Sequence, residues 1–324
     1  DDQLLVDHPV GPRGRLLVRL ASAQLRVSAS GTDRITVRGL DGRRLTDRIA
    51  IDTADGEVTV REKDLLGIVL ATGPRTVRLE IGVPADADVT IDIASGDVHV
   101  SGLRGEQRYR TASASLDLRD LSGRLELTTV SGDATVELAG PTDLQVRSVS
   151  GDVTVAGGRL TAVRVATTSG DVRLGSPLVS SGESQIDTLS GDVSVAVIGG
   201  IRVEARTVSG DLMSDLPNRT EGRMGRRTLI IGDGSTRLGF RSVSGDLFVR
   251  SAADRGEAAR PTPSLARTTD DGEPDGRGRE DGDDRMAVLR ALERGDLDVA
   301  TAMDRLAALD DRDDDAASSS SAVL

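Results

Sequence analysis

The chain has 324 residues and a formal net charge of −12. It contains no cysteine, which excludes disulfides and thiolate metal sites. Only three residues are aromatic, and no basic stripe interleaved with aromatic side chains suggests nucleic-acid binding. The longest apolar run, residues 65–71, is too short for a transmembrane segment. We expect a cytoplasmic protein, or an extracellular or cell-surface protein if an export signal has been removed before Asp1.

The first 94 residues predict an irregular N-terminal β cap together with the first units of a stack. Residues 1–15 are polar and rich in Pro and Gly, and we expect a loose lead-in there. From Arg15 onward apolar residues alternate with polar ones at period two, which is typical of half-buried strands. Examples are Leu16, Val18, Leu20, Val77, Leu79 and Ile81.

Residues 95–250 are organised by a Ser-Gly-Asp tripeptide that returns about every twenty residues. Its serines are Ser95, Ser131, Ser150, Ser169, Ser190, Ser209 and Ser244, with a decayed copy at residues 113–115. Apolar positions recur three and five residues after these serines, and four and six before them, with Ser214 and Ser184 as exceptions. Each repeat therefore predicts two short strands with one apolar face each, which are buried only when repeats stack. The predicted fold is all-β, a single-stranded parallel β-solenoid or β-helix.

The aspartate of each tripeptide is the repeated chemical group of the chain. The members are Asp97, Asp133, Asp152, Asp171, Asp192, Asp211 and Asp246. We interpret them as a structural ladder in which each carboxylate accepts turn N–H groups. The alternative is a row of weak calcium sites, although calcium-binding β-rolls use a denser pattern of Gly and Asp.

An insertion, residues 216–237, interrupts the last repeat and predicts a hairpin or long loop. It supplies a candidate interaction patch of Arg219, Arg223, Arg226 and Arg227. Arg147, Arg206 and Arg241 share one outward column and could extend this patch, although scattered solvated charges are the simpler interpretation. Phe240 and Phe248 fall in the last repeat, where we expect them to cover the open end of the stack.

The C-terminal 74 residues change character. Residues 251–284 have the composition of a disordered acidic linker, and residues 311–324 form a second acidic, Ser-rich tail. Between them, residues 285–310 predict a small α-helical hairpin that is too short to form its own core. Its apolar face would mediate association with a second copy or another protein, and consists of Met286, Leu289, Leu292, Met303, Leu306 and Leu309.

Catalysis is not expected from this composition. The two histidines, His8 and His99, lie far apart in the sequence, and without cysteine there is little material for a nucleophilic triad. The outward columns show no concentration of carboxylates of the kind that cleaves polysaccharides. No cofactor is predicted.

The Val-Ser-Gly-Asp-Val-x-Val pattern, clearest in residues 149–155, resembles the bacterial family known as putative adhesins, as does the segment that precedes the repeats, residues 83–89. The resemblance covers about residues 15–250 and implies a right-handed β-helical domain without known catalytic residues. Residues 286–309 resemble the SHOCT-like helical hairpin, a module associated with oligomerisation. Some relatives that pair the two domains are linked to cell-envelope stress.

These features together predict a non-enzymatic scaffold or protein-interaction protein that self-associates through its C-terminal hairpin. The alternative is a cell-surface adhesin or glycan-binding protein.

Overall fold

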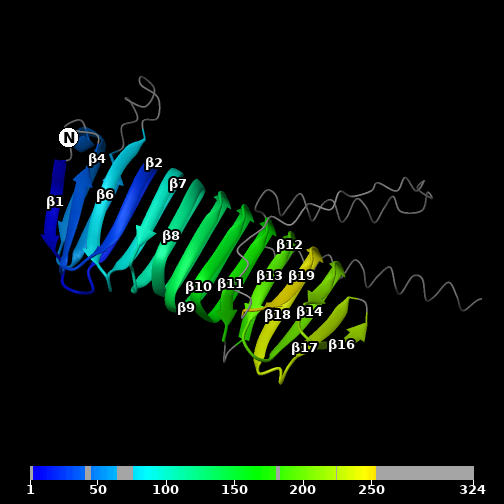
Figure 1. Ribbon diagram of the computed structural model, residues 1–324. Coiled ribbons are helices and arrows are strands. Elements are labelled where there is room, and N and C mark those ends of the chain that lie inside the picture. Colours follow the sequence, from blue (N-terminus) through cyan, green and yellow to red (C-terminus); the bar gives the residue numbers. More distant parts are fainter. Residues whose placement is uncertain (1–2, 41–44, 64–75, 180–182, 224, 253–324) are drawn as a thin grey trace, which may run out of the picture. The chain divides into compact units, whose positions relative to one another are not determined.

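A computed structural model describes residues 3–40, 45–63, 76–179, 183–223 and 225–252. In these residues 19 strands form one open sheet that stacks along the domain (Figure 1). The all-β, solenoid-like prediction is therefore confirmed. The only helix of the described residues, α1 (Leu45–Arg48), is far too short to cross a membrane. The predicted linker, helical hairpin and tail lie outside the described residues.

The strands are β1 (Gln3–Pro9), β2 (Arg15–Ser30), β3 (Arg34–Gly39), β4 (Ile49–Ala54), β5 (Glu57–Glu62), β6 (Val77–Pro84), β7 (Asp88–Ser101), β8 (Glu106–Ser131), β9 (Ala134–Ser150), β10 (Val153–Ser169), β11 (Val172–Leu178), β12 (Glu183–Ser190), β13 (Val193–Val197), β14 (Ile201–Ser209), β15 (Leu212–Ser214), β16 (Asn218–Arg223), β17 (Arg226–Ile231), β18 (Thr236–Ser244) and β19 (Leu247–Ser251).

In the middle of the stack each repeat forms one rung, which pairs in parallel with the next repeat along the chain. Val153, for example, pairs with Ala134 of the preceding rung and Val172 of the following one, and all three are buried. Two short strands per repeat were expected, yet β8, β9 and β10 are long bent strands that run through a corner. Because every inward position is buried against its neighbours, the apolar core is continuous along the stack.

The Ser-Gly-Asp corner depends on its glycine. Gly151 has a φ of 149°, which side-chain-bearing residues rarely adopt, and a Cβ placed on it would lie 2.5 Å from the carbonyl oxygen of Gly132. The corner therefore needs glycine both for its backbone angle and for the close approach of successive rungs.

At the N-terminal end, the spatial order of strands differs from the chain order. Strand β2 pairs in parallel with β7 on one side and with β5 and β6 on the other. Residues 22–24 thereby align with the tripeptide at residues 95–97, so a complete rung precedes the first Ser-Gly-Asp. The expectation of a loose lead-in is wrong for residues 3–9, because they form β1 and pair with β3.

The C-terminal end is interleaved in the same way. Strand β18 lies between β12 and β14, and β19 lies between β13 and β15, with all four pairings parallel. The rung of Ser244 therefore sits between those of Ser190 and Ser209. The expectation that Phe240 and Phe248 cover the open end is wrong, because the rung that contains them is flanked on both sides.

The insertion forms the edge of the sheet beyond the rung of Ser209. Strand β17 pairs antiparallel with β14, and β16 pairs antiparallel with β17. Every residue of β16 is exposed. The predicted hairpin is therefore present, and it extends the sheet by two strands.

Candidate functional site

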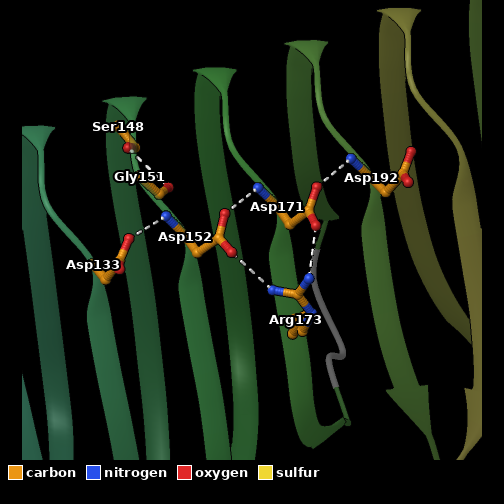
Figure 2. Close-up of polar contacts among 7 residues, drawn as sticks. All are labelled: Asp133, Ser148, Gly151, Asp152, Asp171, Arg173 and Asp192. Atoms are coloured by element: carbon orange, nitrogen blue, oxygen red, sulfur yellow. Dashed lines mark hydrogen bonds and ion pairs between the residues drawn. The ribbon is translucent and has the colours of Figure 1, made fainter. Parts of the chain in front are cut away.

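The aspartates of the tripeptides form a hydrogen-bonded ladder along one corner of the stack (Figure 2). In each step, the Oδ1 atom of one aspartate accepts a hydrogen bond from the backbone N–H of the aspartate in the next rung. The distances are 3.0 Å from Asp133 to Asp152, 2.9 Å from Asp152 to Asp171, 3.0 Å from Asp171 to Asp192, 3.0 Å from Asp192 to Asp246 and 2.7 Å from Asp246 to Asp211. The carboxylates thus connect neighbouring rungs.

Two arginines offset the negative charge of this ladder. Arg173 donates to Oδ2 of Asp152 at 3.1 Å and to Oδ2 of Asp171 at 2.6 Å (Figure 2). Arg227 lies 3.5 Å from Asp211, the last member in space. Asp97 takes no part in the ladder among the described residues, since its neighbouring rungs carry Gln24 and Ser115 at that position.

The described residues contain no group of three His, Asp or Glu side chains arranged to hold a metal ion. What the structure shows of the aspartate column is its hydrogen bonding between rungs.

The four arginines of the predicted patch do not share one surface. Arg227 pairs with Ala205 on the core-facing side of β17, and from there it reaches Asp211. Arg219 forms an ion pair of 2.9 Å with Glu221. Arg223 and Arg226 pair directly with each other on the outward side of the hairpin.

Arg223 and Arg226 continue into a row of four arginines across the sheet. In β14, Arg206 pairs with Arg226 on one side and with Arg241 of β18 on the other. The spatial order is Arg241, Arg206, Arg226, Arg223, and we call this set the arginine row. Paired residues project from the same side of a sheet, so four guanidinium groups share one outward surface.

The arginine row is short of counter-charges. None of its members has an ion-pair partner among the described residues, whereas several outward arginines elsewhere in the stack do have one, as in Arg19–Asp92, Arg108–Glu126 and Arg119–Asp117. Like charges about 5 Å apart repel by roughly 1 kcal/mol even in water. Directly opposed like charges in a sheet are destabilising. The row is therefore locally unfavourable for the stability of the fold, and such unfavourable arrangements are expected at functional or strained sites.

The surroundings of the row are partly acidic, since Asp187 of β12 pairs with Arg241 and adjoins the β18 end of the row. A second line of residues runs parallel to the row, two positions away from it on each strand, and consists of Gly239, Glu204, Thr228 and Glu221. Beyond that lie Arg237 and Arg202, and Arg202 is 3.4 Å from Glu204. An open hollow of about 580 Å³ covers the hairpin end of the row and is lined by Glu221, Gly222, Arg223, Arg226 and Thr228.

Sequence reasoning could name the members of the row but not assemble them. Arg206 and Arg241 share a column with Arg147, yet Arg147 lies on another part of the stack, 3.6 Å from Glu126. The information that the sequence lacked is the register of the insertion against β14, which depends on the interleaved order of the last rungs.

Comparison with known proteins identifies the family. The Toastrack DUF4097 family matches residues 14–250. The chain belongs to this family. A search among curated proteins finds no significant match for this Toastrack protein.

Several solved structures are similar to the Toastrack protein at low sequence identity. A putative adhesin from Bacteroides fragilis shares 13% identity with a TM-score of 0.41, covering 78% of this chain and 97% of its own. A putative adhesin from Parabacteroides merdae shares 12% identity with a TM-score of 0.38, covering 78% and 94%. A putative lipid binding protein from Parabacteroides distasonis shares 12% identity with a TM-score of 0.33, covering 78% and 96%.

Proposed function

We propose that this Toastrack protein is a non-enzymatic interaction scaffold, in which a rigid stack presents the arginine row to an acidic partner. The observation that carries the proposal is the row itself, with four guanidinium groups in register and without ion-pair partners among the described residues. The aspartate ladder supports it, because hydrogen bonds between successive rungs hold the surface in a fixed geometry. A preorganised surface loses little entropy on binding.

Retention of the full chain on an anionic sulfonate resin tests the proposal. The double variant Arg206→Gln/Arg226→Gln should elute at clearly lower salt than the wild type. The variant Arg26→Gln/Arg38→Gln removes the same charge from the opposite end of the stack and should elute close to the wild type. Equal shifts for the two variants would mean that net charge, not the row, governs binding.

The scaffold role also includes self-association through the predicted C-terminal hairpin. The apolar residues from Met286 to Leu309 would pair with a second copy because a hairpin of this size cannot bury them alone. Sedimentation velocity of the full chain should show an oligomer that dissociates in the variant Leu289→Asp/Leu306→Asp. A monomeric wild type contradicts this part of the proposal.

The resemblance to envelope-stress proteins extends the proposal to a place of action. Transcription of the gene should then rise under agents that damage the cell envelope. The competing function, a surface adhesin, predicts saturable binding to glycans that survives replacement of the arginine row.

A further inference from the structure

We propose that the arginine row binds a linear polymer of phosphate groups that lies across strands β18, β14, β17 and β16. This inference rests on the proposed interaction function and specifies the chemistry of the acidic partner. Guanidinium groups donate in a planar fork that matches the oxygens of phosphate.

The spacing of the row favours a chain of anions over a single one. Neighbouring strands lie about 4.8 Å apart, so the four arginines extend over roughly 14 Å in a nearly straight line. One phosphate ion can contact two adjacent guanidinium groups and leaves the others without a counter-charge. A polymer with an anion at every unit neutralises all four at once.

The flanking carboxylates favour a narrow ligand over a flat one. Glu204 and Glu221 occupy the neighbouring line, and their side chains are 70% and 51% exposed. An anionic membrane surface would face these carboxylates and the arginines together, whereas a single chain can follow the arginine row and avoid them. An anionic membrane is therefore the less favourable partner.

The side chains near the row also argue against single-stranded nucleic acid. Proteins that hold such strands stack the bases on exposed aromatic rings. Tyr109 and Phe240 are buried in the core, and Phe248 belongs to β19, away from the strands that carry the row. The row therefore offers contacts to phosphate groups and none to bases.

At the hairpin end, a polymer longer than the row can extend beyond it. The hollow of about 580 Å³ beside Arg223 and Arg226 is open, and Thr228 contributes a hydroxyl to its lining. Strand β16 is exposed along its whole length, so a chain longer than the row can continue past the edge of the sheet.

Binding of the full-length protein to long-chain inorganic polyphosphate, followed by isothermal titration calorimetry, tests the inference. Affinity should rise from orthophosphate to tripolyphosphate to the long chain, and should fall steeply as salt is added, because binding releases counterions. The variant Arg206→Gln/Arg226→Gln should lose about tenfold or more in affinity. The control Arg26→Gln/Arg38→Gln should stay within about twofold. All four sites are on the surface, and the thermal midpoint of each variant verifies folding.

The other outcomes identify what fails. If both variants weaken binding equally, or if affinity does not depend on chain length, the phosphate-polymer site is overturned. Stronger, row-dependent binding to phosphatidylglycerol vesicles than to polyphosphate would replace it with a membrane site. If the protein binds sulfonate resin through the row but does not bind polyphosphate, this inference fails while the proposed interaction function stands.

Discussion

Glu126 joins three rungs on the outer surface of the stack, remote from the arginine row. It accepts a hydrogen bond of 2.8 Å from Nε of Arg108 and lies 3.6 Å from Arg147, with only 16% of its side chain exposed. The hydrogen bond and charge of Arg108 hold the pKa of Glu126 below its ordinary value, against the opposing effect of burial. Paired carboxylates of this kind make folding depend on pH.

The variant Glu126→Gln should therefore unfold more easily than the wild type at neutral pH, by about 1 kcal/mol. The pKa is lower in the folded state, so the contribution of the carboxylate is present above its unfolded pKa and is lost as the pH falls through the folded value. Urea unfolding of both proteins should show stabilities that converge in acid below pH ~4. A difference that stays constant across that range would mean that the pair does not contribute through its charge.

Asp152 tests the ladder at a single position. The variant Asp152→Ala removes the acceptor of the Asp171 N–H and a partner of Arg173, and should cost about 1–2 kcal/mol in urea unfolding. Asp152→Asn keeps an acceptor oxygen and should cost less. Equal losses for the two variants would show that the inter-rung hydrogen bond contributes little.

The cation interpretation of the same column has its own measurement. If the ladder is structural, the thermal midpoint of the full chain should be the same in excess calcium and in chelator. A midpoint that rises with calcium would establish ligand binding to the folded state.

At the scale of an element, the interleaved rung of Ser244 contains two phenylalanines that differ in burial. Phe240 is 1% exposed and pairs with Ile186 on one side and Ala205 on the other, whereas Phe248 is 37% exposed. Phe240→Ala should lower the free energy of unfolding by about 3–5 kcal/mol, and Phe248→Ala by less than about 1 kcal/mol. If calorimetry shows similarly small losses of stability for both variants, Phe240 must lie at an open end of the stack.

The corner offers a second comparison at this scale. Gly151→Ala should destabilise the protein by about 2 kcal/mol or more, because its φ is positive and its Cβ would meet the backbone of the previous rung. Gly31→Ala, with open space around it, should be nearly neutral. Equal thermal midpoints for the two variants would mean that the rungs can separate locally.

The sequence predicts the elements better than it predicts their neighbours. Alignment on Ser-Gly-Asp places Ala134, Val153 and Val172 in one inward column. The pairing of Val153 with Ala134 on one side and Val172 on the other follows from the repeat. The burial of Phe240 on both sides could not be predicted. The Ser244 rung has the same inward residues whether it lies between the rungs of Ser190 and Ser209 or beyond the rung of Ser209. The arginine row had the same obstacle, since Arg206 meets Arg226 only through the register of the hairpin.

At the scale of the whole described domain, position along the chain and position in the stack separate at both ends. Strand β19 pairs with β13 and β15, while in the described residues β15 pairs with β19 alone. Amides of residues 247–249 should therefore exchange with deuterium more slowly than those of residues 212–214, although they lie later in the chain. Faster exchange at residues 247–249 would contradict the interleaved order.

The interleaved end also sets an order of events during synthesis. Rungs up to β13 can stack as they leave the ribosome, because each finds its neighbour already in place. Strand β14 emerges before β18, the strand that must lie between it and β12. The C-terminal end can therefore close only after residue 251 has been made, and until β18 and β19 are made nascent β14 lacks its β18 partner and β15 lacks β19.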